Sequence, residues 1–327
     1  MYDIISIGSA TRDVLLESAG LSAGGGSASG GDHSICLTPG SKIEVKKLVL
    51  ATGGGGTNYA VTFARQGLKT ACIGVIGKDA NGQEILRELK GESVDVSMFQ
   101  QHDDPPSPEG FGGASMTAYS VILVYPDGER TILSYKGEGQ HFSAAQIDFS
   151  KLQSKWLFLD SLGGHYDLFE ALVNHAVKNN IKIACNPGGK ELAHGLEKLK
   201  PFLAHLDIFL VNKEEAASLF GEQSPREFMS KAIISISDGP QGVSVTDPEG
   251  HTYTAGIPDS PVVERTGAGD AFGSGFVSEY IRSGNIEKAI QFGTANASSV
   301  VTQFGGKAGI LKQGDNGPWP LVHVDTK

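Results

Sequence analysis

Two glycines and an aspartate stand together where a long helix is expected to begin. The segment reads Gly267-Ala268-Gly269-Asp270, and the pattern after it predicts a helix over residues 268–283. The first backbone N–H groups of a helix have no partner within the helix and carry the positive end of its dipole, so they can bind anionic oxygens. An aspartate placed there can accept the proton of an attacking hydroxyl group. This arrangement suits phosphoryl transfer, and it equally suits a tight turn in which Asp270 caps the helix.

A second glycine-rich segment precedes another predicted helix. Four successive glycines run from Gly53 to Gly56, just ahead of a helix expected over residues 57–66. Each glycine costs backbone entropy when it is ordered and adds no buried side chain, so packing alone does not account for the run. Glycines let a ligand approach the backbone closely at Gly53 and Gly54, and Asn58 supplies an amide that can hydrogen-bond a hydroxyl group. A flexible linker is the alternative, but linkers are not normally followed at once by an amphipathic helix.

Three further short motifs accompany the two glycine-rich segments. In chain order, the five are Gly8-Ser9 with Asp13 after it, Gly53 to Asn58, Asn212-Lys213-Glu214-Glu215, Ser237 to Gly242, and Thr266 to Asp270. In these motifs and their order, the chain resembles the ribokinase-like (PfkB) family of carbohydrate and nucleoside kinases over nearly its whole length. Any one of the motifs is weak, but five in the family's order are specific.

The resemblance implies an ATP-dependent kinase with Mg²⁺ as its metal ion. Asp270 would act as the general base, and the N–H groups of Gly267, Ala268 and Gly269 would hold the developing charge. The other site residues that it implies are Asp13, Gly53, Gly54 and Asn58 for the substrate, Asn212, Ser237, Gly239, Gly242 and Asn296 for the nucleotide, and Glu215 for Mg²⁺.

Ordinary structural roles compete with several of these assignments. Asp13 follows a strand end and could be a solvated turn residue. Glu215 stands at a helix start, where an acid interacts favourably with the helix dipole. Gly239 and Gly242 could form a plain turn between two strands, and Asn296 could cap or bridge helices.

Two departures from the family pattern bear on the ligands. Glu264-Arg265 stand where many members have Asp-Thr, next to a site where some members bind potassium. Arg265 could replace that monovalent cation, so potassium dependence is left open. Gly55 stands where ribokinases have a lysine, which disfavours ribose as the substrate.

Strands and helices alternate along most of the chain. Strands are expected over residues 69–77, 156–160, 181–187, 207–212 and 232–237, and helices over 81–90, 166–180, 214–220, 268–283 and 286–302. This alternation predicts a single α/β domain, a three-layer α/β/α structure with a mainly parallel central sheet. Ligands then bind beyond the carboxyl ends of the strands.

Two stretches interrupt the alternation. Residues 34–49 alternate loosely in hydrophobicity, and 119–125 pairs plausibly with 131–135 as a hairpin. The resemblance implies that such pieces, from about 13–50 and 110–135, form a small β-lid over the substrate that often makes a dimer contact.

The apolar residues of this lid predict its partner. Ile43 and Val45 would lie in a small sheet that has little of its own core to cover them. Exposed edges and apolar faces are usually covered in proteins. We therefore expect a homodimer joined through the lids.

Composition argues against several other classes of protein. The net charge of −10 over 327 residues, with a pI near 5.4, argues against a nucleic-acid binder, which needs a basic face. The three cysteines, Cys36, Cys72 and Cys185, lack the spacing of a disulfide framework or a zinc site. No leader is recognisable, and no apolar run reaches the roughly 18 residues of a membrane span. We expect a cytoplasmic protein that binds neither nucleic acid nor membrane.

Three interpretations of function stay open. The first is an ATP-dependent kinase of a small sugar or sugar derivative. The second is a nucleoside kinase, adenosine-like in substrate, which the size or aromatic lining of the pocket would distinguish. The third is a noncatalytic sensor of a sugar or nucleotide. Asp270 between its glycines argues against the sensor, because a sensor has no use for a base.

Overall fold

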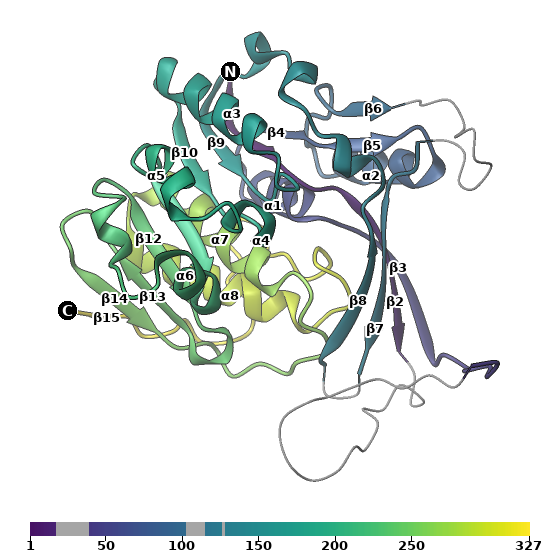
Figure 1. Ribbon diagram of the computed structural model, residues 1–327. Helices are drawn as coiled ribbons and strands as arrows, with labels where there is room; N and C mark the ends of the chain where they lie inside the picture. Colours follow the sequence, from purple (N-terminus) through teal and green to yellow (C-terminus); the bar gives the residue numbers. More distant parts are fainter. Residues whose placement is uncertain (18–38, 103–114, 126–127) are drawn as a thin grey trace.

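A large sheet with helices on both faces carries a small sheet at its side (Figure 1). The structure, a computed structural model, describes residues 1–17, 39–102, 115–125 and 128–327. In spatial order the large sheet contains β15 (Asp325–Thr326), β14 (Thr252–Ala255), β13 (Val243–Thr246), β12 (Ile233–Ser237), β11 (Ile208–Asn212), β10 (Lys182–Cys185), β9 (Ser154–Leu159), β1 (Tyr2–Ile7) and β4 (Thr70–Ile73). The strands from β12 to β4 pair in parallel, and β13, β14 and β15 add antiparallel pairs at one edge. The predicted mainly parallel sheet is confirmed.

The helices form two layers around this sheet. They are α1 (Gly55–Arg65), α2 (Ala80–Gly91), α3 (Tyr166–Lys178), α4 (Gly189–Leu192), α5 (Leu196–Leu203), α6 (Lys213–Phe220), α7 (Ala268–Ser283) and α8 (Ile286–Val300). Alternate residues of β9 point to opposite faces: Leu157 and Leu159 pack with α3, α5 and α6, whereas Trp156 and Phe158 pack with α1, α7 and α8. A strand that is apolar on both faces is typical of a buried parallel sheet. The three-layer prediction is confirmed.

Some predicted elements have different bounds. Helix α1 begins at Gly55, inside the glycine run, so two of the glycines form its first turn. The strand expected over residues 69–77 is two strands, since β5 (Val75–Gly77) leaves the large sheet to pair with β6 (Gln100–His102). Helix α5 was not predicted, and it contains Pro201. Cys72 and Cys185 are buried free thiols, and Cys36 lies outside the described residues.

The small sheet has the order β3-β2-β7-β8. Its strands are β3 (Lys47–Gly53), β2 (Thr11–Glu17), β7 (Ala118–Val124) and β8 (Arg130–Tyr135). The predicted hairpin is confirmed, because β7 and β8 pair antiparallel. The short link 8–10 joins β2 directly to β1 of the large sheet.

The small sheet lies largely within the predicted lid ranges of about 13–50 and 110–135, but residues 34–49 contribute less of it than expected. Residues 39–46 form no strand, the strand begins at Lys47, and 34–38 lie outside the described residues. Ile43 and Val45 are therefore exposed residues of an irregular segment. The strand of this sheet that was not predicted is β2, which carries Asp13 and pairs with both β3 and β7. Within the described residues, no helix has the length and apolarity to cross a bilayer.

Candidate active site

Asp270 and Asn58 meet although they lie far apart in the chain. Helix α7 begins at Ala268 after Gly267, whose φ of 78° is left-handed, and no side chain caps the helix. The carboxylate of Asp270 instead accepts a hydrogen bond from Asn58, with Nδ2 2.8 Å from Oδ2. The two glycine-rich segments thus lie at one place, and the capping alternative for Asp270 is not what the structure shows.

Asp270 lies where two cavities adjoin. The larger cavity, about 850 Å³, is lined by Asp13, Gly54, Asn58 and Asp270 among others. The smaller, about 270 Å³, is lined by Asp270 and by residues of the predicted phosphate side: Asn212, Glu215, Ser237, Gly267, Ala268 and Gly269. A group bound in the larger cavity and a phosphate bound in the smaller one would therefore meet at the Asp270 carboxylate.

The surroundings of Asp270 favour its neutral form. Desolvation raises the pKa of Asp270, although the hydrogen bond from Asn58 and the positive charge of Lys307 oppose the shift. A carboxylate whose pKa is raised holds a proton more tightly. Such a group is suited to accepting a proton from a substrate hydroxyl.

Asp13 is buried in the wall of the larger cavity. It is 6% exposed, so it is not a solvated turn residue. Thr11 Oγ1 donates to Asp13 Oδ1 at 2.9 Å, and burial raises the pKa of Asp13 while hydrogen bonds from Thr11 and Ser120 lower it. Gly53 makes room for this carboxylate, because a Cβ there would lie 1.9 Å from Asp13 Oδ2. Gly54 lines the cavity itself.

Asn212 and Glu215 form a capping box at the start of α6. Glu215 N donates to Asn212 Oδ1 at 2.8 Å, and Asn212 N donates to Glu215 Oε2 at 2.9 Å. Both side chains also line the smaller cavity. The capping box uses one carboxylate oxygen, so Glu215 Oε1 is the atom that could face Mg²⁺. A carboxylate oxygen beside a helix start suits Mg²⁺, which is commonly held by one or two carboxylates together with phosphate oxygens.

The predicted nucleotide residues divide between cavities. Ser237 lines the smaller cavity, and Gly242 lines a neighbouring one of about 520 Å³ together with Lys213 and Asp238. Gly242 has a φ of 96°, and a Cβ there would lie 2.0 Å from a backbone oxygen, so glycine is required by the fold. Gly239 has a left-handed φ and open space around it.

Asn296 has a structural role in α8. Its side chain is fully buried. Nδ2 donates to the Ala271 carbonyl at 2.7 Å, and Oδ1 accepts from Leu311 N at 2.9 Å. The amide thus bridges α7, α8 and the C-terminal segment, which is the alternative that the sequence left open. We leave Asn296 out of the proposed site.

Two charged residues near Asp270, Asp160 and Arg130, were not predicted, and a third, Arg265, was expected only to replace a monovalent cation. Asp160 follows β9, is 6% exposed, and has a pKa raised by desolvation and by the charge of Asp270. Arg130 and Arg265 line the smaller cavity, and Arg265 Nε lies 2.9 Å from Glu129 Oε1. Asp160 ends a predicted strand, and ligands bind beyond the carboxyl ends of such strands, so its position in the sequence could have indicated a role in the site. Arg130 had no such signal, because only the folded hairpin brings it to α7.

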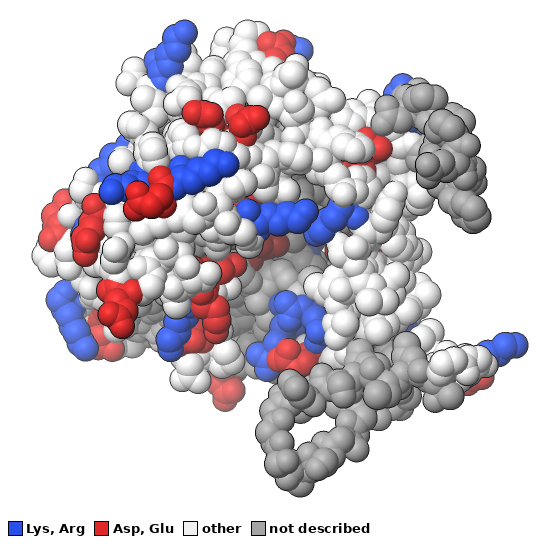
Figure 2. All heavy atoms as spheres, in the orientation of Figure 1, with Lys and Arg blue, Asp and Glu red and all other residues white. Residues whose placement is uncertain are grey.

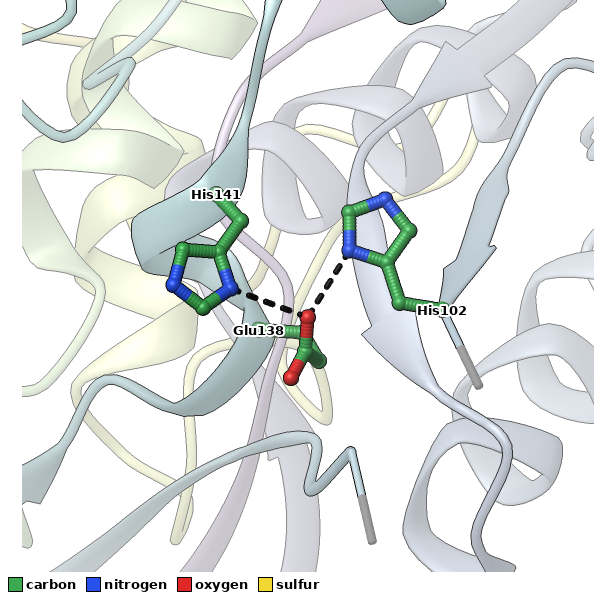
Figure 3. Close-up of side chains that lie close together, drawn as sticks. All are labelled: His102, Glu138 and His141. Carbon is green, nitrogen blue, oxygen red and sulfur yellow. Dashed lines mark hydrogen bonds and ion pairs between the residues drawn. The ribbon is translucent and has the colours of Figure 1, made fainter. Parts of the chain in front are cut away.

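The carboxylate of Glu138 lies between the imidazoles of His102 and His141 (Figure 3). Glu138 Oε2 accepts from His102 Nδ1 at 2.8 Å and from His141 Nδ1 at 3.1 Å. His102 ends β6, while Glu138 and His141 lie on the 3₁₀ helix η1 (Gly137–His141). The pKa of Glu138 is lowered overall, because the upward effect of burial is outweighed by hydrogen bonds from His141 and His102 together with smaller contributions in the same direction. This group fixes η1 against β6.

Comparisons with known proteins identify related kinases. Residues 2–313 match the model of the pfkB family carbohydrate kinases. A ribokinase from Haemophilus influenzae is 29% identical over 296 residues, which cover 85% of this chain and 92% of that protein. An ATP-dependent ribose-1-phosphate kinase from Halopiger xanaduensis is 26% identical over 255 residues, or 76% and 79% of the two chains. The solved nucleoside kinase of Methanocaldococcus jannaschii has the same fold, with a TM-score of 0.73 at 19% identity over 95% of each chain.

Proposed function

Because this chain belongs to the pfkB family of carbohydrate kinases, we propose that it transfers the γ-phosphoryl group of ATP to a hydroxyl group of a small sugar or sugar derivative. The position of Asp270 at the boundary of two cavities carries the proposal. The sugar would occupy the larger cavity, and the phosphates of ATP the smaller one.

Each residue near this boundary has a distinct task in the proposed reaction. Asp13 and Asn58 orient hydroxyl groups of the sugar, and Asp270 accepts the proton of the attacking hydroxyl. The N–H groups of Gly267, Ala268 and Gly269 stabilise charge on the transferred group, because preorganised donors need no reorientation during the reaction. Glu215 would hold Mg²⁺, which neutralises charge on the phosphates when it is bound. Asn212 and Ser237 would contact the nucleotide, with Gly239 and Gly242 beside it.

The lining of the larger cavity favours a sugar over a nucleoside. Phe142 is the one phenylalanine, tyrosine or tryptophan among its described lining residues. A base-binding pocket usually offers aromatic faces on which the base can stack. A nucleoside kinase therefore remains the second candidate.

A screen of ATP consumption tests the proposed function. The purified protein would be incubated with ATP and Mg²⁺ against a panel of sugars, sugar derivatives and nucleosides, and ADP release would be measured. We expect turnover with sugars or sugar derivatives. Turnover with nucleosides alone would establish the second candidate. If none of the acceptors in the panel gives ADP release although the nucleotide still binds, both kinase proposals are contradicted.

Potassium is expected to have little effect on activity. Glu264 is fully buried, accepts from Gly305 N at 3.3 Å, and lies 3.9 Å from Arg130 Nε. With Arg265 in the adjacent cavity, positive charge is already present near the turn before α7. Initial rates in sodium, potassium and tetramethylammonium chloride at equal ionic strength should differ by less than about threefold, under 1 kcal/mol in activation free energy. Strong activation by potassium alone would show that a cation site survives.

A homodimer through the small sheet is also expected. Leu50, Val14, Val121 and Leu133 lie in one row across its four strands. Leu50 is 56% exposed and Leu133 is 58% exposed, so the ends of this row are uncovered in the single chain. Pairing with the same face of a second copy would cover them.

Charged substitutions on that face test the dimer. Leu50→Glu and Leu133→Glu should give monomers with poorer sugar affinity and unchanged ATP affinity, as judged by light scattering and calorimetry. Val177→Glu is the matched control, because Val177 is an exposed apolar residue on α3, away from the small sheet. A fully active monomer of the unmodified protein at micromolar concentration would refute the arrangement.

A further inference from the structure

Two lysines without partners line the larger cavity. Lys136 precedes η1 and Lys190 lies on α4, and both are exposed. Among the described residues, no ion pair or hydrogen bond engages either ammonium group. The cavity therefore contains positive charge that the protein itself does not neutralise.

The two lysines belong to one rim of the cavity. A Cβ on Gly164 would lie 2.9 Å from Lys190 Cβ, and a Cβ on Gly163 would lie 3.5 Å from the carbonyl oxygen of Gly139 in η1. The same rim includes His165, whose buried Nε2 has no hydrogen-bond partner. Figure 2 shows Lys and Arg side chains around the hollow between the large body and the small sheet.

The acids of the cavity lie on other elements. Asp13 is on β2, and Asp270 is on α7 beside Asn58. The cavity thus has an acidic part, suited to sugar hydroxyls, and a basic rim. A neutral sugar needs no ammonium partners, whereas charge-assisted hydrogen bonds to phosphate or carboxylate are the strong ones. Unpaired cations at a cavity mouth also attract anions from solution.

We propose that the sugar substrate carries an anionic group, a phosphate ester or a carboxylate, which Lys136 and Lys190 bind at this rim. The inference rests on the proposed kinase function and specifies its substrate class. His165 Nε2 is a third group that can donate to the same anion. The hydroxyl to be phosphorylated then faces Asp270 while the anionic group remains at the rim.

The rim is anchored by the buried carboxylate of Glu138 (Figure 3). A buried charge is costly unless it is paired, and here both imidazoles pair with it. This support fixes the backbone of η1, which begins directly after Lys136 and contributes Gly139 and Gln140 to the cavity wall. Glu138 is therefore a positioning residue for the rim.

Steady-state kinetics with matched acceptors test the anion site. Ribose and fructose would be compared with their monophosphates, as phosphate esters, and with gluconate, as a carboxylate. We expect kcat/KM to be at least about tenfold higher for one of the anionic classes, as a charge-assisted hydrogen bond allows. Whichever class is preferred identifies the anionic group.

Lysine variants then assign the effect to the rim. Lys136→Ala and Lys190→Ala should each lower kcat/KM for the anionic sugar by about tenfold, mainly through KM, and leave kcat/KM for neutral sugars unchanged. Lys178→Ala, on the surface of α3, should change neither value. The preference for the anionic sugar should weaken as salt is added.

The experiments distinguish a failure of the anion-site proposal from a failure of the proposed kinase function. Equal kcat/KM for neutral and anionic sugars, or a preference that survives both lysine substitutions, overturns the anion site while phosphoryl transfer stands. If no acceptor is phosphorylated, calorimetry of ribose 5-phosphate and of gluconate with the AMP-PNP-saturated protein decides the question. Binding that is lost in the lysine variants supports the anion site, and binding that is absent or independent of the lysines overturns it.

Discussion

Replacing Asp270 by asparagine is expected to lower kcat by about 10²–10⁴-fold, the usual contribution of a general base. Asparagine keeps the size of the side chain and an oxygen that can accept the Asn58 hydrogen bond, but it cannot take up a proton. The protein should therefore stay folded and bind ATP with similar affinity. Steady-state kinetics, thermal unfolding and nucleotide titration would measure the three quantities.

The pH profile provides a second measurement of the same role. Desolvation raises the pKa of Asp270 above its ordinary value of 3.8, against the effects of Asn58 and Lys307. A base works in its deprotonated form, so kcat/KM should fall as pH drops through this raised pKa. The same shift favours the protonated form of the folded protein, so Asp270 itself destabilises the fold above pH 3.8 and costs no stability in acid.

A neighbouring acid offers a matched control for Asp270. Asp160 is buried nearby but is not among the lining residues of either cavity. Asp160→Asn should leave kcat within about tenfold of the unmodified value, because no proton transfer is assigned to it. Near-normal turnover in Asp270→Asn, or a larger loss in Asp160→Asn, would remove Asp270 from the base role.

Replacing Gly267 by alanine should damage both stability and turnover. A left-handed backbone costs a residue other than glycine about 1–2 kcal/mol, and the added Cβ would lie 2.6 Å from the backbone of Gly306. Relief of this clash is expected to move the start of α7, whose first residues line the smaller cavity. We expect a lower unfolding temperature and a loss of about 10²-fold in kcat, comparable to the removal of one oxyanion donor.

Gly269 serves as the stability control in the same turn. It has open space where a Cβ would lie, and its φ is not left-handed. Gly269→Ala should therefore leave the unfolding temperature unchanged in differential scanning calorimetry. If Gly267→Ala unfolds at the same temperature as Gly269→Ala and retains its kcat, the start of α7 is not held by the contact with Gly306.

Local sequence patterns predicted much of the large sheet and missed part of the small one. Strand β9 and helix α7 follow from apolar periodicity and glycine placement within their own segments. Strand β2 was missed because Thr11, Arg12 and Glu17 make it polar at both ends, and its partners β3 and β7 come much later in the chain. Alternating hydrophobicity predicted a strand around Ile43 and Val45. The prediction failed because alternation alone does not guarantee a pairing partner.

The site was predictable where glycine marks it. The two glycine-rich segments point to Asn58 and Asp270, because closely spaced glycines are seldom needed except where a ligand approaches the backbone. The cations had no comparable signal. Lys136, Lys190 and Arg130 reach the cavities only through the approach of η1, α4 and the β7-β8 hairpin to the large sheet. Their roles depend on tertiary contacts that no local pattern specifies.

The strand order of the large sheet sets the order in which the chain can fold. From β9 to β14, each strand pairs with the next in sequence, through helical crossovers as far as β12 and short connections after it, so this half closes over local stretches of chain. Strand β1 instead pairs with β9, and β2 pairs in parallel with β7. Neither pairing can form until a distant part of the chain has been synthesised. Long loops cost more closure entropy and slow folding. Since Asp13 and Asn58 come from the early half and Asp270 from the late half, the proposed catalytic centre cannot assemble on a nascent chain until these long-range contacts form.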